Sequence, residues 1–250
     1  MAPSRRELLE KVVFLGAALG FGQCWPGLAQ AAVVDGDLRA QLEVCKPSLK
    51  PLQQLIAGNQ RFMKAWAAAG EAESPDLRMQ ALQLAYGDGD CEIKPQALAK
   101  GQRPWAAVLT CADSRVPLEW LFNTGDGELF GVRSAGNTAF NEGVASLEYA
   151  VANLDVPLIM VLGHSGCGAV TAAMADAMLT PLLEDLVTPI RASFVPGNNL
   201  TEAIKSNACY SAAQLPKRSE LLRKAQTSGK LKIQPAYFDI ESGQVSLLLV

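Results

Sequence analysis

The chain has 250 residues, of which 49% are apolar and 19% are charged. This balance is typical of a globular protein with a substantial core and excludes a largely disordered chain. The formal net charge is −3, so the chain lacks the excess of basic residues that nucleic-acid binding requires. We therefore predict no nucleic-acid partner.

The N-terminal residues have the pattern of an export signal. Arg5-Arg6 precedes an apolar run over residues 12–22, and a small-x-small cleavage site ends at Ala31. The run is shorter than the roughly 20 residues of a membrane-spanning helix, which favours a cleaved signal over a permanent anchor. We interpret residues 1–31 as a twin-arginine-like signal peptide and residues 32–250 as one domain. The domain is expected in the periplasm or a compartment like the thylakoid lumen, and on the membrane only if the signal stays uncleaved.

The rest of the chain alternates between helical and strand patterns. Apolar residues recur at intervals of three and four over residues 35–86, which predicts arm or scaffold helices. Short apolar runs at 105–110, 128–133 and 157–162 predict buried strands, and residues 141–153 between the last two have a helical period. This alternation predicts an α/β fold in which helices flank a parallel-cored sheet.

Two further signals complete the predicted fold. Pro117 suits the first turn of a short helix after the first strand. Residues 232–238 and 245–249 have strand patterns around a short polar turn, which predicts a C-terminal antiparallel hairpin added to the sheet.

Metal-ligating side chains follow two of the predicted strands. Cys111 follows the first, and His164, the only histidine, follows the third, with Cys167 in the same loop. The carboxyl ends of parallel strands form the usual ligand crevice of such folds, so these residues are expected to meet. Thiolate and imidazole are ligands that zinc prefers, and catalytic sites usually hold it with three protein ligands. We predict one catalytic Zn²⁺ per chain. The alternative is a structural zinc site, or two buried thiols beside a core histidine. A structural site, however, usually has a fourth Cys or His ligand.

Asp113 lies two residues after Cys111, within reach of the predicted metal. Its carboxylate could act as a fourth ligand or accept a hydrogen bond from a zinc-bound hydroxide. Two-point pairing with Arg115 favours the second role, because it draws the carboxylate off the metal and lowers its pKa. An ordinary surface ion pair is the other interpretation.

Four motifs, in this order, resemble those of the β-class carbonic anhydrases. They are Cys111-x-Asp113-x-Arg115, Arg133-x-Ala135-Gly136-Asn137, Glu148-Tyr149-Ala150-Val151 and His164-Ser165-Gly166-Cys167-Gly168. The resemblance runs from about Leu52 to the C-terminus. It implies an α/β fold with N-terminal arm helices, assembled as a homodimer or a dimer of dimers with substrate pockets at the dimer interface.

The resemblance also implies roles for individual residues. The three metal ligands and the Asp113–Arg115 pair match the family's zinc ligands and catalytic dyad. Gln102 matches a pocket glutamine that hydrogen-bonds substrate across the dimer. Phe130 and Tyr149 match the apolar wall of the pocket, and Gly168 is also expected to bind the substrate. Ordinary packing is the alternative role for Gln102, Phe130 and Tyr149.

The implied activity is the zinc-dependent, reversible hydration of CO2 to bicarbonate and a proton. Hydrolysis of CS2 or COS on the same fold, or a zinc scaffold without activity, are the alternatives, and the intact dyad argues against the scaffold. Val108 stands where some members carry a tryptophan that helps to hold a second bicarbonate, so that form of inhibition is not expected. Because His164 is a predicted ligand, no histidine is left to act as a proton shuttle.

Overall fold

A computed structural model describes residues 47, 49–83, 95–175 and 178–249. The predicted signal peptide lies outside these residues. None of the helices in these described residues combines the length and the hydropathy that a membrane-spanning segment needs.

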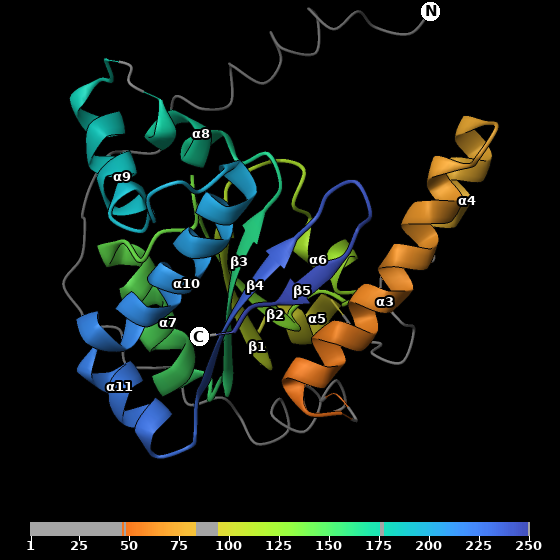
Figure 1. The fold of residues 1–250 in the computed structure, drawn as a ribbon. Helices are drawn as coiled ribbons and strands as arrows, with labels where there is room; N and C mark the ends of the chain where they lie inside the picture. The colour runs from red at the N-terminus through yellow and green to blue at the C-terminus, as the bar shows by residue number, and fades with distance from the viewer. Residues whose placement is uncertain (1–46, 48, 84–94, 176–177, 250) are drawn as a thin grey trace, which may run out of the picture. The chain divides into compact units, whose positions relative to one another are not determined.

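The strands of the described residues form one five-stranded sheet in the order β2-β1-β3-β4-β5 (Figure 1). They are β1 (Ala106–Cys111), β2 (Leu129–Ser134), β3 (Leu158–His164), β4 (Lys232–Phe238) and β5 (Val245–Leu247). The first four strands pair in parallel, and β5 pairs antiparallel with β4. The predicted parallel-cored sheet with a C-terminal antiparallel pair is therefore confirmed. Strands β1 and β3 run slightly further than predicted, so that Cys111 and His164 are their last residues rather than the residues after them.

Helices connect and cover these strands. Their bounds are α3 (Pro51–Gly70), α4 (Pro75–Gln83), α5 (Pro95–Leu98), α6 (Leu118–Leu121), α7 (Asn141–Asn153), α8 (Gly168–Met174), α9 (Pro181–Arg191), α10 (Leu200–Arg218) and α11 (Glu220–Thr227). Helix α7 has the predicted bounds. Pro117 lies one residue before α6, at its N-cap, and not in its first turn.

Each face of the sheet has its own apolar core, because every residue of β1 and β3 is buried. On one face, Val108 and Met160 pack in a cluster with residues of α3 and α6, including Phe62. On the other face, Leu109 and Val161 pack with residues of α7, α10 and α11. Figure 1 shows α7, α10 and α11 together on one side of the strands and α3 on the other. The predicted helices on both faces are thus present.

The predicted helical region at 35–86 contains two helices within the described residues. Helix α3 packs on the sheet through buried residues, and Asn59 donates to the carbonyl oxygens of Leu121 and Gly243. Helix α4 begins at Pro75, where the fixed backbone of proline suits a helix start, and it buries none of its residues. Figure 1 shows that α4 lies beyond the sheet, beside the end of α3.

Candidate metal centre

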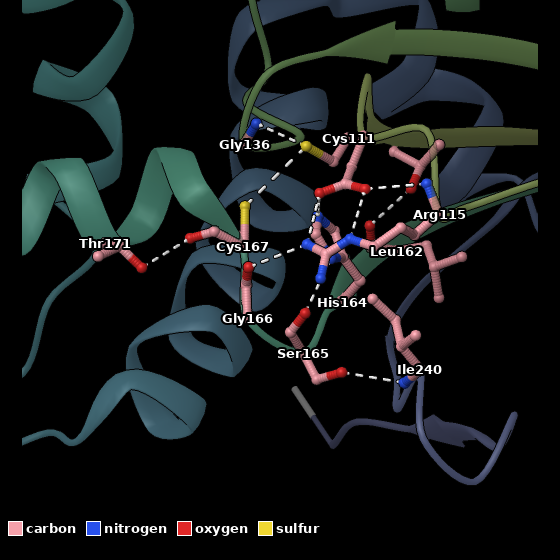
Figure 2. A network of polar contacts seen from close by, with 12 residues as sticks. Cys111, Arg115, Gly136, Leu162, His164, Ser165, Gly166, Cys167, Thr171 and Ile240 are labelled. Atoms are coloured by element: carbon pink, nitrogen blue, oxygen red, sulfur yellow. Dashed lines mark hydrogen bonds and ion pairs between the residues drawn. The ribbon is translucent and has the colours of Figure 1, made fainter.

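The metal-ligating residues meet at the carboxyl edge of the sheet. Strands β1 and β3 are neighbours in parallel register, with Thr110 opposite Leu162, so their last residues lie side by side. Cys167 follows His164 in a turn that Gly166 makes possible with a φ of +63°, a conformation that glycine adopts without strain. Figure 2 shows the side chains of Cys111 and Cys167 directed toward one another beside the end of β3.

The three donor atoms are close enough to share one ion. One atom each from Cys111, His164 and Cys167 lie within 4.8 Å of one another, and all three residues are buried. The two sulfur atoms are 4.0 Å apart. This geometry brings together the three ligands expected from the sequence.

The orientation of His164 leaves one ring nitrogen available to a metal. Its Nδ1 lies 3.1 Å from the carbonyl oxygen of Ser165, which can only accept a hydrogen bond, so we assign the ring proton to Nδ1. Nε2 then carries the lone pair. It is buried and has no hydrogen-bond partner among the described residues. A metal ion would satisfy this nitrogen, and metal-binding histidines are commonly held by such a second bond.

The two thiols also suit a divalent cation. The hydrogen bond with Cys167 is the main cause that lowers the pKa of Cys111. Burial opposes this effect, and the backbone amide of Gly136 adds to the lowering. The same bond and burial raise the pKa of Cys167. Without a cation the pair therefore holds one proton, which metal binding displaces. Two thiolates and a neutral imidazole are a donor set that fits Zn²⁺.

A carboxylate held by a guanidinium lies beside this group. Arg115 donates from Nε to Asp113 Oδ1 at 2.9 Å and from Nη2 to Oδ2 at 2.7 Å, and its backbone amide donates to Oδ1 at 2.9 Å. These bonds hold the pKa of Asp113 well below its usual range. Asp113 Oδ2 is 3.7 Å from His164 Nε2. The two-point pairing expected from the sequence is present, and the carboxylate stays ionised next to the ring nitrogen that is available to a metal.

Arg115 also binds the loop that carries the second thiol. Its Nη2 donates to the carbonyl oxygen of Gly166 at 3.2 Å, as Figure 2 shows. The Asp113–Arg115 pair and the loop containing Cys167 are therefore fixed to one another.

Two supporting residues were not assigned a role from the sequence. Arg133 donates to the carbonyl oxygens of Cys111 at 3.2 Å and Asp113 at 2.8 Å, and so fixes the backbone between them. The amide of Gly136 donates to Cys111 Sγ at 3.3 Å. Both belong to the quoted Arg133-x-Ala135-Gly136-Asn137 motif, whose spacing alone does not reveal these bonds.

The remaining pocket residues lie apart from the metal group within one chain. Gln102 is exposed and precedes β1, at the opposite edge of the sheet from Cys111. Phe130 pairs with Ala107 of β1, which is about 13 Å along the strand from Cys111 at the usual rise per residue. The ring of Tyr149 packs 6.3 Å from that of Phe130.

Gly168, the fourth predicted pocket residue, does lie at the metal centre. It follows Cys167 directly as the first residue of α8. A Cβ added there would meet no heavy atom within 4 Å. The backbone of Gly168 therefore borders open space beside the metal group.

The remaining cysteines do not enlarge this group within the described residues. Cys209 is free and contacts the carbonyl oxygen of Leu249 at 3.8 Å. Cys45 and Cys91, whose pairing the sequence leaves open, lie outside the described residues.

This fold and donor set describe an α/β protein with a group of side chains that can hold a metal ion, and comparisons with known proteins show its family. A family model described as carbonic anhydrase matches residues 106–245. The chain is 36% identical over 213 residues to carbonic anhydrase 2 of Mycobacterium tuberculosis, a match that covers 80% of this chain and 94% of that protein. It is 34% identical over 199 residues to a carbonic anhydrase of Mycolicibacterium smegmatis, covering 76% of this chain and 94% of that protein.

Solved structures agree with these relatives. A tetrameric β-carbonic anhydrase from the ascomycete Sordaria macrospora matches with a TM-score of 0.56 at 25% identity, over 62% of this chain and 85% of that chain. A Coccomyxa β-carbonic anhydrase in complex with acetazolamide matches with a TM-score of 0.55 at 25% identity, over 62% and 77% of the two chains. The chain belongs to the β-carbonic anhydrase family. It is a zinc-dependent enzyme that hydrates CO2 to bicarbonate.

Proposed function

We propose that Cys111, His164 and Cys167 hold the zinc ion and that Asp113, oriented by Arg115, is the catalytic acceptor. Zinc, when bound, lowers the pKa of water toward neutrality and so makes hydroxide available as a nucleophile. All other steps in this proposal are carried out by the side chains of the chain itself.

Asp113 directs the nucleophile toward CO2. Because its pKa is held far below neutrality, its carboxylate accepts hydrogen bonds and does not donate them at working pH. An acceptor in this place fixes the hydrogen of the nucleophile and turns the oxygen lone pair toward the carbon of CO2. The two bonds from Arg115 keep the carboxylate from turning toward the metal as a fourth ligand.

The single observation that carries this assignment is the two-point bond of Arg115 to a carboxylate 3.7 Å from His164 Nε2. An ordinary surface ion pair does not explain this arrangement, because both members of the Asp113–Arg115 pair also form hydrogen bonds to other parts of the chain. The carbonyl of Asp113 is bound by Arg133, and Arg115 is bound to the Gly166 carbonyl.

Two substitutions separate the proposed roles. Cys167→Ser should lose zinc, measured as metal per chain. Asp113→Asn should keep one zinc per chain and lose about 100-fold or more in kcat/KM for CO2 hydration, because misplacing a reacting group by about 1 Å can cost that much. Zinc retained by Cys167→Ser together with full activity of Asp113→Asn would contradict the assignment.

We propose further that the active form is a homodimer, alone or paired into a tetramer, in which the partner copy completes each substrate pocket. Gln102, Phe130 and Tyr149 would serve the metal group of the other chain, which accounts for their distance from their own. Tyr149 is 49% exposed although it is a large aromatic residue, as suits a side chain that a second copy covers. The Sordaria macrospora relative is tetrameric.

A mixing experiment tests the shared pocket. Gln102→Leu and Cys167→Ser each damage every site of their own homodimer. In a mixed dimer, one site contains both substitutions and the other contains neither, so coexpression should restore up to half of the wild-type activity per mixed dimer. Activity no higher than the average of the two separate variants would show that each pocket belongs to one chain.

We propose finally that residues 1–31 direct export as a cleaved twin-arginine signal and that residues 32–250 act in the exported compartment. The Arg5-Arg6 pair and the cleavage pattern support this. The test is cell fractionation with N-terminal sequencing, with the pair replaced by two lysines as the control. Processed wild-type protein in the exported soluble fraction is expected. Uncleaved protein in the cytoplasm, or in the membrane fraction, would contradict the proposal.

A further inference from the structure

Asn207 is a buried polar residue that connects α10 to the metal group. Its side chain is fully shielded from solvent. Its Nδ2 donates to the carbonyl oxygen of Gly136 at 2.7 Å, across 71 residues of sequence. The backbone amide of the same Gly136 donates to Cys111 Sγ at 3.3 Å, which Figure 2 shows. Two consecutive hydrogen bonds therefore link Asn207 to a thiol of the metal group.

The turn at Gly136 is closely packed on its other side. Gly136 has a φ of +82°, and a Cβ there would lie 2.5 Å from Cδ1 of Ile190 and 3.2 Å from Cβ of Ala169. Helices α8 and α9 thus limit how far the turn can move. The amide and the carbonyl of Gly136 belong to two rigid peptide planes that meet at its Cα, and the contact of Ile190 and Ala169 with this Cα limits how far one plane can rotate against the other. A bond that fixes the carbonyl therefore also restricts the direction of the amide hydrogen. Asn207 supplies that bond.

The orientation of the Asn207 amide follows from its partner. A carbonyl oxygen can only accept, so Nδ2 and not Oδ1 must face Gly136. Oδ1 has no hydrogen-bond partner among the described residues. A buried amide with one side unsatisfied adds little to the stability of a fold. The useful interaction of Asn207 is thus concentrated at Gly136.

We propose that Asn207 is a positioning residue for Cys111, holding Gly136 so that its amide hydrogen bonds the thiolate and fixes the sulfur in the zinc group. The inference rests on the proposed role of Cys111 as a zinc ligand. Removing a group that orients a metal ligand typically changes metal affinity or activity by about 10- to 100-fold. An effect of that size is expected here, although Asn207 touches neither metal nor substrate.

The test compares zinc binding in two variants of the full chain. Asn207→Leu keeps the number and branching of the side-chain heavy atoms and removes the donor. Ser211→Ala is the matched control, because Ser211 is also buried and lies one turn further along α10. The measurements are the zinc dissociation constant by competition with a chelator, the thiolate-to-metal absorption band of the cobalt-substituted protein, and the melting temperature.

Asn207→Leu is expected to bind zinc about 10-fold or more weakly and to shift the thiolate-to-cobalt band. Its melting temperature should fall by a few degrees while the variant stays folded, because the Gly136 carbonyl oxygen loses its donor. Ser211→Ala is expected to resemble wild type. A purely structural role for Asn207 would not move the absorption band of a folded variant.

Three results would overturn the inference. The first is wild-type zinc affinity and absorption in Asn207→Leu, and the second is an equal effect of Ser211→Ala. If Asn207→Leu does not fold, Asn207→Asp replaces the donor with an oxygen of the same size, and wild-type affinity and absorption in that variant would be the third. Failure of the wild-type chain to bind zinc would instead refute the proposed function, so the two failures are distinguishable.

Discussion

Replacing Arg115 by leucine removes the group that orients Asp113 without touching the metal ligands. Arg115→Leu loses two of the three hydrogen bonds to the carboxylate and keeps the one from the backbone amide to Oδ1. The freed oxygen, Oδ2, is the one that lies 3.7 Å from His164 Nε2. The carboxylate can then rotate out of its catalytic position and toward the metal.

The size of the effect follows from that geometry. A displacement of a reacting group by about 1 Å can cost about 100-fold in rate, so kcat/KM is expected to fall about 100-fold. The loss should be independent of pH. The folded pKa of Asp113 is depressed, and losing Arg115 raises it only toward the ordinary carboxyl value of about 3.9. Asp113 therefore stays ionised across the neutral range in both proteins.

The assay is stopped-flow CO2 hydration at several pH values, with zinc per chain measured on the same samples. Arg223→Leu is the matched control. The Arg223 side chain is 53% exposed against 51% for Arg115, and it pairs with Glu220 at 2.8 Å. Activity of Arg115→Leu within threefold of the control would refute the reasoning. So would a loss that disappears as the pH rises, because it would indicate protonation of Asp113 rather than misorientation.

Three further predictions concern the fold and proton release. A Cβ at Gly58 would lie 1.8 Å from the backbone oxygen of Phe122, so Gly58→Ala should lower the free energy of unfolding, measured in urea, by about 3 kcal/mol. Gly70→Ala is the control and should not lower it, because a Cβ at Gly70 would meet no heavy atom within 4 Å. Asn59→Leu leaves the carbonyl oxygens of Leu121 and Gly243 and the amide of Val245 unpaired, and it should lower the free energy of unfolding by about 3 kcal/mol or more in the same assay. An unchanged urea midpoint of unfolding would contradict these contacts. Because His164 is the only histidine, turnover at low buffer should rise with buffer concentration, and a rate that does not respond would point to an internal carboxylate shuttle.

The sequence predicts the sheet and α7 well because their signals are local. The buried strands are short apolar runs, and α7 has a regular apolar face that begins and ends where predicted. The strand ends at the site were placed slightly early, since the apolar pattern stops before Cys111 and His164. The backbone continues to pair beyond that pattern, with Ala112 donating to Ser134 and Ser165 donating to Phe238.

The metal ligands and the Asp113–Arg115 pair could also be predicted, because their residue types and short spacings carry chemical meaning. The supporting bonds could not. Asn207 and Gly136 are 71 residues apart, and nothing near either of them in sequence indicates the bond that joins them. Such contacts depend on how α10 packs against the sheet, which is a tertiary property.

The central claim is that this chain hydrates CO2 with one zinc ion held at the Cys111, His164 and Cys167 group. The most direct test is stopped-flow CO2 hydration by the zinc-quantified protein between about pH 6.5 and 9, where an ionisation that generates the nucleophile would appear. We expect one zinc per chain and a kcat/KM that rises with pH along a single ionisation. Full zinc occupancy without CO2 hydration at any pH in this range would contradict it.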